Sequence, residues 1–342
     1  MKLTWSRQRI VCAHPFGTAR DTSTAKQTIV VRLDHDGVTG LGEAAPVSYY
    51  GQSVESAEST LGRAAPLLGD DPFCFETILD RLCAAFGDQR ATIAAIDAAL
   101  HDWVGKRLGV PVWRLLGIDP AGMPTTSFTI GVDNLETIAL KVRQADDYPI
   151  LKIKIGTENE VDILETVRHH APDKTLRVDA NTGWSSGDAD ARLQRVLAYD
   201  LELVEQPVLP GEDDTLTRLT QASPVPVIAD ESAVVPADVP ALAGCVDGIN
   251  IKLSKCGGIR EAYRMIAIAR ALDMKIMLGC MIESSLGIAA AAQLAPLVDY
   301  VDLDGHLLLA EDPFTGLDHQ NGKLILSTQP GLGVSAKGSI AN

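Results

Sequence analysis

Short β-rich runs recur at a nearly constant interval through the second part of the chain. That interval, about 22 to 27 residues, fits one strand, one helix and two loops. Apolar residues recur at helical spacing in the gaps, for example over residues 136–146 and 259–272. The runs begin near Thr125, Ile150, Leu176, Asp200, Pro226, Gly248, Lys275 and Tyr300. Eight strands alternating with helices predict a TIM-like (β/α) barrel over residues 116–316. A doubly wound sheet is the structural alternative, but no Gly-x-Gly-x-x-Gly turn opens the series.

Residues 1–115 follow a different pattern. A β-branched, apolar run over 28–33 precedes a glycine-containing turn, and residues 38–43 look like its hairpin partner. Helical spacing follows over 53–68 and 75–108. We therefore predict an α+β capping domain with an antiparallel sheet. The short, glycine-rich tail, residues 317–342, is expected to pack back on this domain.

The amino-acid composition excludes some classes of binding partner and favours one cellular compartment. The net charge of −15 would repel nucleic acid and anionic membranes, so neither is an expected partner. The sequence contains no run of about 18 apolar residues, so we predict no membrane span. The N-terminal residues 1–16 do not resemble a signal peptide. Six scattered cysteines without a Cys-x-x-Cys pair favour a reduced, cytoplasmic protein. Apolar helix faces leave room for a homo-oligomer.

Two lysines lie two residues apart on the second predicted barrel strand, residues 150–156. Side chains alternate along a strand, so Lys152 and Lys154 point to one face. If the apolar residues between them pack against helices, both ammonium groups point into the barrel mouth, where such barrels carry their active sites. Their repulsion is expected to lower the pKa of each, which suits a general base near neutral pH. An edge strand with two exposed lysines is the simpler alternative.

An acid stands at the end of each of the next three predicted strands: Asp179, Glu205 and Asp230. One such acid would usually cap a helix or face solvent. Three on successive barrel strands converge, and they would repel one another unless a cation neutralises them. A hard divalent cation with oxygen ligands, such as magnesium, does so. The sequence therefore predicts a magnesium site.

Lys252 ends the sixth predicted strand, from which it would face Lys154 across the barrel. A base on each side of a substrate carbon is the minimal machinery for inverting that carbon. Alternatively, Lys252 only neutralises the acids. Lys255 is out of phase with Lys252 and is expected to support the following loop.

Asp302 and Asp304 share one face of the eighth predicted strand, by the same two-residue period. They are expected to lie away from the three acids, where they could bind a cationic group. A second metal site and the start of a loop are the alternatives.

Together these motifs resemble the enolase superfamily, in its muconate-lactonizing-like branch, and within it the dipeptide epimerases of the L-Ala-D/L-Glu type. The resemblance covers nearly the whole chain. It includes the segment 42–44 and the loop 49–53, which in the family closes over the site. It implies a modified (β/α)7β barrel and Mg²⁺ as cofactor. It also implies that Asp179, Glu205 and Asp230 are the magnesium ligands. Lys154 and Lys252 would be the acid/base pair, and Lys152 would contact the substrate carboxylate.

The resemblance further implies substrate contacts. Asp302 and Asp304 resemble the Asp-x-Asp element with which dipeptide epimerases hold the α-ammonium group. Thr129 matches a substrate-contacting position on the first barrel strand, and Ile282 matches a side-chain pocket position on the seventh. Arg20 falls where enzymes acting on Ala-Glu carry an arginine for the glutamate side chain, with a surface arginine as the alternative.

The expected activity is inversion of the Cα next to the C-terminal carboxylate of a small dipeptide, by two-base 1,1-proton transfer through an enediolate. Magnesium and Lys152 would stabilise its negative charge. The alternatives within the superfamily are an o-succinylbenzoate synthase, an N-acylamino acid racemase or a muconate cycloisomerase-like enzyme. A synthase or N-acyl racemase substrate lacks a free ammonium, which leaves the Asp-x-Asp element without a role. A non-catalytic barrel would not need opposed lysines.

Overall fold

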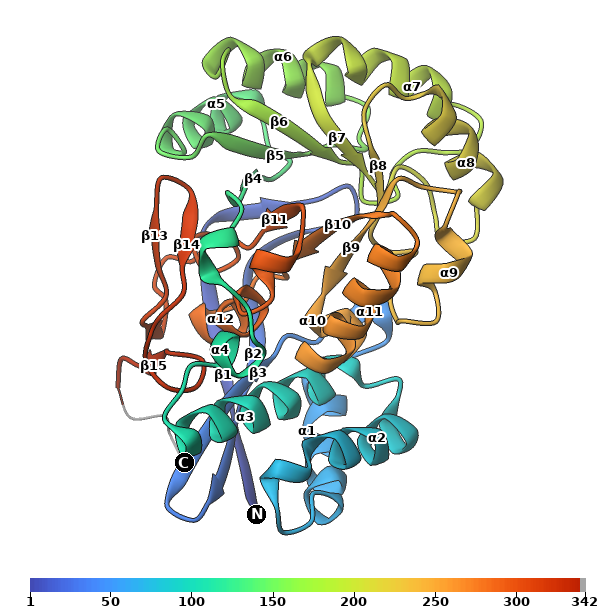
Figure 1. Cartoon of the computed structure of the whole chain (residues 1–342). Coiled ribbons are helices and arrows are strands. Elements are labelled where there is room, and N and C mark those ends of the chain that lie inside the picture. The colour runs from blue at the N-terminus through green and yellow to red at the C-terminus, as the bar shows by residue number, and fades with distance from the viewer. Residues whose placement is uncertain (339–342) are drawn as a thin grey trace.

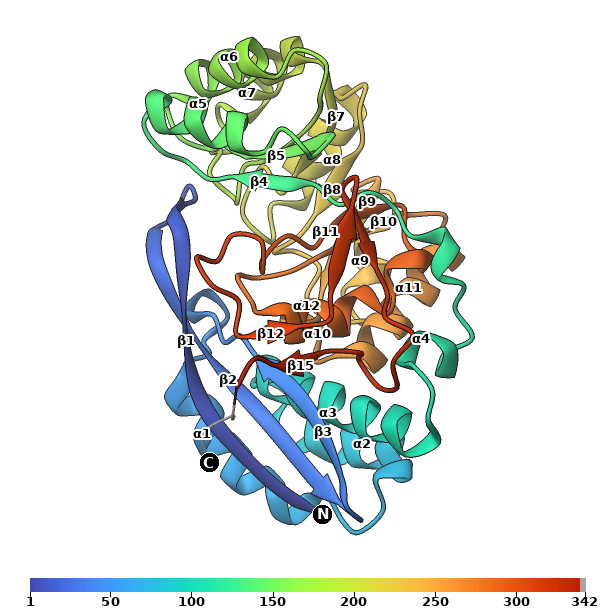
Figure 2. The same cartoon turned by 90° about the vertical axis from the view of Figure 1, so that its left-hand side faces the viewer.

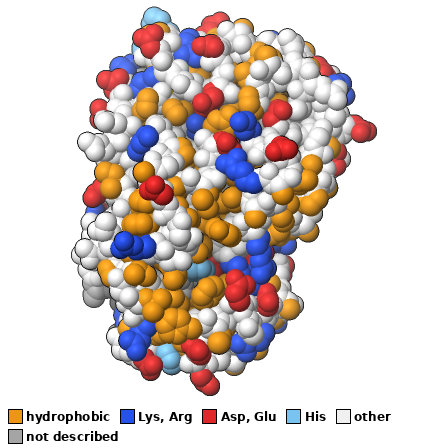
Figure 3. All heavy atoms as spheres, in the orientation of Figure 1, with side chains coloured by type: hydrophobic (Ala, Val, Ile, Leu, Met, Phe, Trp, Pro, Cys, Tyr) orange, Lys and Arg blue, Asp and Glu red, His pale blue; other side chains and the backbone are white. Residues whose placement is uncertain are grey.

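The computed structural model describes residues 1–338. An N-terminal α+β unit precedes eight parallel strands that curve around a common axis with helices outside them (Figure 1). No helix within the described residues is long and apolar enough to cross a membrane. Acidic and basic side chains are interspersed on the face shown in Figure 3, so the net charge of −15 is not concentrated there.

Three antiparallel strands and three main helices form the N-terminal unit. The strands are β1 (Lys2–Gly17), β2 (Thr22–His35) and β3 (Val38–Ala44), in that order. The helices are α1 (Val54–Ala64), α2 (Phe75–Phe86) and α3 (Arg90–Leu108), with short turns η1 (Ser48–Tyr50), η2 (Ala65–Leu67), η3 (Pro72–Cys74) and α4 (Val112–Leu115). The hairpin of β2 and β3 was predicted. The edge strand β1 was not, because polar residues occupy both of its faces. The helical stretch predicted over residues 75–108 is two helices, since α2 ends before Gly87.

The barrel strands begin close to the predicted positions. They are β4 (Phe128–Ile130), β5 (Ile150–Lys154), β6 (Thr175–Asp179), β7 (Leu201–Glu205), β8 (Val227–Ala229), β9 (Gly248–Lys252), β10 (Lys275–Gly279) and β11 (Tyr300–Asp302). Between them lie α5 (Leu135–Gln144), α6 (Glu160–His170), α7 (Ala189–Val196), α8 (Asp213–Ala222), α9 (Val239–Leu242), α10 (Leu253–Cys256), α11 (Ile259–Ala271) and α12 (Ser285–Ala292). The short turns η4 (Pro120–Gly122), η5 (Leu197–Tyr199) and η6 (Ala295–Leu297) complete the set. The predicted TIM-like barrel with a capping domain is confirmed.

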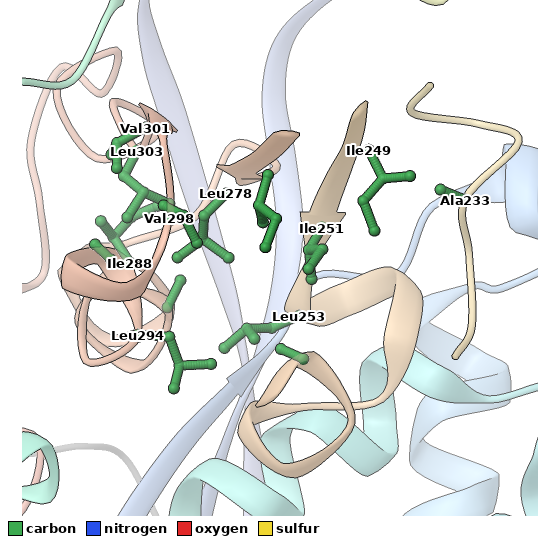
Figure 4. Packing of buried hydrophobic residues seen from close by; sticks show 14 of the residues in the cluster. Ala233, Ile249, Ile251, Leu253, Leu278, Ile288, Leu294, Val298, Val301 and Leu303 are labelled. Atoms are coloured by element: carbon green, nitrogen blue, oxygen red, sulfur yellow. The ribbon is translucent and has the colours of Figure 1, made fainter. Parts of the chain in front are cut away.

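Alternation along the strands decides which side chains enter the barrel. Ile249 and Ile251 of β9, Leu278 of β10 and Val301 of β11 are fully buried in the large apolar cluster that also contains residues of α11 and α12 (Figure 4). The residues that alternate with them, among them Lys252, therefore point to the other face of the sheet.

The barrel closes between β4 and β11 without a continuous ladder of backbone hydrogen bonds. The ladder runs from β11 through β10 to β4, and an isolated bridge joins Thr126 to Val301. Ser127 N donates to Val301 O at 3.1 Å, and Leu303 N donates to the Thr126 Oγ1 at 2.9 Å. Side chains thus complete this seam.

The C-terminal segment contacts both units. It contains the strand pairs β12 (Phe314–Thr315) with β15 (Ser335–Ala336) and β13 (Asp318–Gln320) with β14 (Lys323–Ile325). Gly331 O accepts a hydrogen bond from Val112 N at 2.9 Å, next to the capping unit. Gly322 O accepts one from Thr126 N at 2.8 Å, at the barrel seam.

Asp102 on α3 joins three distant segments, so the variant Asp102→Ala is expected to lower the free energy of unfolding by about 2–5 kcal/mol. Its buried carboxylate accepts hydrogen bonds from Leu41 N at 2.8 Å, Leu332 N at 2.8 Å and Lys106 Nζ at 2.6 Å. Truncation leaves these donors without their acceptor. Urea unfolding measures the loss, with the exposed Asp70→Ala as a control expected to change stability by less than about 0.5 kcal/mol. Equal midpoints for the two variants would contradict this role.

Candidate active site

Three carboxylates converge at the carboxyl ends of successive barrel strands. Asp179 and Glu205 are the last residues of β6 and β7, and Asp230 directly follows β8. One carboxylate oxygen from each lies within 4.8 Å of the others, and all three side chains are buried. The convergence predicted from the spacing of these acids is therefore present.

Two lysines approach the three carboxylates from opposite sides. The Lys154 Nζ donates to Asp179 Oδ2 at 2.6 Å, and the Lys252 Nζ donates to Asp230 Oδ2 at 2.8 Å. Lys154 lies on β5 and Lys252 on β9, and the sheet order places these strands on either side of β6, β7 and β8. Lys152 and Lys154 are both buried on β5, so the alternative of an edge strand with two exposed lysines is wrong.

Lys152 is more central than the resemblance implied. Its buried ammonium lies 2.7 Å from Glu205 Oε2, 3.2 Å from Asp179 Oδ2 and 2.7 Å from Asp302 Oδ2. Asp302 therefore does not lie away from the three acids, as the sequence argument predicted. The prediction failed because closing the barrel brings the end of β11 close to β4 and β5.

The pKa shifts of the lysines run against expectation. Burial favours the neutral amine, but Asp302 and Glu205 raise the pKa of Lys152 above its usual value. Burial opposes the charged form of Lys252 as well, and Asp230 raises its pKa. For Lys152, the predicted lowering of the pKa by repulsion is wrong because the surrounding carboxylates outweigh it. Burial and the neighbouring Asp179 raise the pKa of Glu205 to about 7.

Lys255 and Asn250 hold two of the acids from behind. The Lys255 Nζ donates to Asp230 Oδ1 at 2.5 Å and to the backbone oxygens of Asn250 and Ala233, both at 2.9 Å. Lys255 thus contacts one of the three acids as well as the loop. The Asn250 Nδ2 donates to Glu205 Oε1 at 2.8 Å, a contact that the sequence analysis missed. Its phase with Lys252 on β9 was the available signal.

The capping unit reaches this cluster through the β1–β2 hairpin (Figure 2), whose Gly17 O accepts a hydrogen bond from Val132 N at 2.9 Å. Arg20 on this hairpin lies with Nη1 2.6 Å from Glu231 Oε1, and its guanidinium lies 4.4 Å from the centre of the Tyr49 ring. The Arg20 side chain is still 34% exposed, so Arg20 lies at the surface edge of the cluster. Glu231 is buried and was missed, although it directly follows Asp230.

The remaining predicted residues differ in their access to the cluster. Thr129 N donates to Asp304 Oδ2 at 2.5 Å, which places Thr129 beside the Asp-x-Asp element. Asp304 lies in the loop after β11 instead of on the strand. Ile282 packs under β1 in a small apolar cluster with Ile10, Cys12 and Leu309, so its main contacts join the two units.

Residues 3–117 match the family described as mandelate racemase / muconate lactonizing enzyme, N-terminal domain, and residues 135–340 match the family described as enolase C-terminal domain-like. The chain belongs to the enolase superfamily. Within the superfamily it is similar to a protein named L-Ala-D/L-Glu epimerase from Bacteroides thetaiotaomicron, with 40% identity over 98% of this chain and 88% of that protein.

Solved structures of the superfamily share this architecture closely. A dipeptide epimerase from Enterococcus faecalis, in complex with Mg and L-Leu-L-Tyr, has a TM-score of 0.92 at 32% identity, covering 97% of this chain and 98% of that one. An N-succinyl Arg/Lys racemase from Bacillus cereus also has a TM-score of 0.92, at 27% identity over 98% of this chain and 96% of that one. The fold alone therefore does not choose between these reactions.

Proposed function

We propose that this protein is a magnesium-dependent epimerase that inverts the Cα next to the C-terminal carboxylate of dipeptides, with L-Ala-D/L-Glu-like substrates. One observation carries the proposal: Lys154 and Lys252 approach a single carboxylate cluster from opposite sides. The 40% identical relative named L-Ala-D/L-Glu epimerase supports the substrate class. The six cysteines are free, which supports a reducing, cytoplasmic setting.

The carboxylate cluster fits a magnesium ion. Its donors are all oxygens, the atoms that magnesium prefers, and they lie within 4.8 Å of one another. Glu205 Oε2 is buried and lies 2.7 Å from the Lys152 ammonium, so this oxygen already faces a positive charge that a bound cation could share. We assign Asp179, Glu205 and Asp230 as the magnesium ligands. When bound, the ion supplies positive charge that stabilises negative charge on a substrate carboxylate.

The lysines carry the proton transfers in this proposal. One of Lys154 and Lys252 removes the proton from Cα, and the other returns a proton to the opposite face, which inverts the centre. Each epimer uses the opposite lysine as its base. Lys152 contributes a positive charge close to the substrate carboxylate, where negative charge develops.

Recognition of the rest of the dipeptide falls to the strand seam and to the capping unit. The Asp-x-Asp element offers buried carboxylates for a free ammonium group, and Thr129 borders it. We propose that Arg20 contacts the C-terminal side chain of the substrate. Because Glu231 already pairs with Arg20, an acidic substrate side chain would share this arginine with Glu231. Ile282 would border the pocket for this substrate side chain.

We assign residues 1–115 as the cap, 116–316 as the catalytic barrel and 317–342 as the tail.

An N-acylamino acid racemase is the second candidate, because a racemase of that class matches the fold equally well. Its substrates carry no ammonium group, so two buried aspartates at the seam count against it.

Deuterium exchange at Cα tests the proposal. The protein is incubated in D₂O with magnesium and a panel of L-Ala-L-X dipeptides and N-succinyl amino acids. We expect dipeptides to exchange the Cα proton of the C-terminal residue and to form the second epimer. A chelator should reduce the exchange to background, because the developing charge then lacks its cation, and added magnesium should restore it. Exchange of N-succinyl amino acids without exchange of any dipeptide would overturn the dipeptide assignment.

A further inference from the structure

The three acids of the carboxylate cluster have one feature in common: a donor of the protein holds one oxygen of each acid from behind. The donors are a backbone amide, a side-chain amide and an ammonium group, and we call them the rear donors. The pairs are Asn181 N with Asp179 Oδ1 at 2.8 Å, Asn250 Nδ2 with Glu205 Oε1 at 2.8 Å, and Lys255 Nζ with Asp230 Oδ1 at 2.5 Å. The rear donors therefore fix how each carboxylate is turned.

The other oxygen of each acid faces the lysines at the barrel mouth. The Lys152 ammonium lies 3.2 Å from Asp179 Oδ2 and 2.7 Å from Glu205 Oε2. The Lys252 ammonium lies 2.8 Å from Asp230 Oδ2. Within residues 1–338, every partner of these three oxygens is a lysine ammonium group. A cation that enters the cluster therefore meets one oxygen from each acid.

Lys255 is the most firmly held of the rear donors. Its side chain is fully buried, and its ammonium also contacts the backbone oxygens of Asp230, Ala233 and Asn250, at 2.5, 2.9 and 2.9 Å. Backbone oxygens do not move when the Asp230 side chain rotates, so the ammonium stays in place. Its positive charge also repels a cation from Asp230 Oδ1. The two amide donors carry no net charge and lack this second effect.

A set of acids that each offer one oxygen suits magnesium better than calcium. Magnesium requires nearly ideal octahedral geometry with ligands at about 2.0–2.1 Å. Calcium takes about six to eight oxygens at about 2.3–2.6 Å and often uses both oxygens of one carboxylate. An acid whose second oxygen is held from behind cannot offer both to the same ion. The rear donors thus limit the acids to one ligand atom each, which disfavours the ion that needs more.

We propose that Lys255 is a positioning residue that makes this site select magnesium over calcium, because it holds Asp230 Oδ1 from behind and leaves a cation only Oδ2. Asn250 has the same role toward Glu205. This inference rests on the proposed function, since it takes the three acids as the metal ligands. It adds which divalent cation the site accepts and which residues decide it.

The variants Lys255→Met and Asn250→Ala test this role. Lys255→Met removes the ammonium but keeps a long, unbranched side chain, and Asn250→Ala removes the donor to Glu205 Oε1 without changing a charge. Each variant is expected to shift the ratio of the dissociation constants for Mg²⁺ and Ca²⁺ roughly 10-fold toward calcium, since loss of a partner of a metal-binding group changes metal affinity by that order. The lost charge of Lys255 affects both dications alike and cancels in the ratio.

Both constants are measured on chelator-treated protein by competition with Mn²⁺, whose free concentration is read by electron paramagnetic resonance. Weak binding of either ion is then still measured, and no dipeptide is present, so the result does not depend on turnover. Lys106→Met is the matched control. Lys106 pairs with Asp102 at 2.6 Å on α3, away from the cluster, and its variant is expected to keep the parent ratio.

Thermal unfolding establishes that each variant is folded, and Asn250→Ala decides the test if Lys255→Met does not fold. A folded Lys255→Met with the parent ratio overturns the role of Lys255, whatever Asn250→Ala does. Equal affinity of the parent for Mg²⁺ and Ca²⁺ overturns the selectivity and leaves the proposed function standing. A parent protein that binds neither ion, nor Mn²⁺, refutes the metal site of the proposed function itself.

Discussion

Glu205→Gln is expected to reduce epimerisation by more than about 100-fold while leaving the fold intact. The three carboxylates together would neutralise one divalent cation, and glutamine keeps the shape of Glu205 but removes its charge. The fold should tolerate the amide, because burial and Asp179 already raise the pKa of Glu205 to about 7. This carboxyl is therefore partly protonated, and so partly uncharged, near pH 7. Turnover at limiting magnesium and calorimetric titration of magnesium measure the two effects separately.

Glu202→Gln is the matched control for this variant. Glu202 lies on the same strand, β7, and pairs with Arg177 at 2.6 Å instead of joining the carboxylate cluster. Its substitution is expected to leave magnesium affinity unchanged. Near-normal turnover of Glu205→Gln at limiting magnesium would remove Glu205 from the proposed ligand set.

Lys154→Ala and Lys252→Ala are expected to lose epimerisation together but to lose Cα deuterium exchange separately. If the two lysines stand on opposite faces of Cα, each removes the proton from only one epimer, so each variant should stop exchange for a different epimer. Removing a positive charge also changes the pKa of the remaining lysine, so exchange is measured for both epimers over a range of pH. Lys275→Ala, an exposed position at the start of β10, is the control.

Crossed selectivity is the decisive observation for these variants. Should both lose exchange with the same epimer and keep it with the other, the two-base arrangement is refuted. A one-base mechanism with Lys252 as an electrostatic helper would then account better for the site.

The regular part of the fold and the acids at its strand ends were predictable, since both follow from spacing. A repeat of strand and helix fixes where each strand ends, and the ends of parallel barrel strands meet at one mouth. Asp179, Glu205 and Asp230 therefore came together as expected. The same alternation correctly placed Lys154 and Lys252 inside the barrel.

Contacts between strands distant in sequence were not predictable in the same way. A two-residue period says which face a side chain occupies, but it does not say which strand lies opposite after the sheet closes. The ion pair of Lys152 with Asp302 depends on that closure, and so does the raised pKa of Lys152. The pairing of Arg20 with Glu231 depends on the path of a hairpin that no periodicity describes.

The seam between β4 and β11 gives the barrel one join that differs from the others. Elsewhere neighbouring strands share a ladder, but here an isolated bridge and the side chains of Thr126 and Ser127 make the connection. Asp304, in the loop after β11, accepts a hydrogen bond from Thr129 N across this seam. A substrate bound beside Asp304 would add its own hydrogen bonds across this seam, where the barrel sheet is least continuous. Closing the barrel and capturing the substrate would then be linked parts of one equilibrium, so each would strengthen the other.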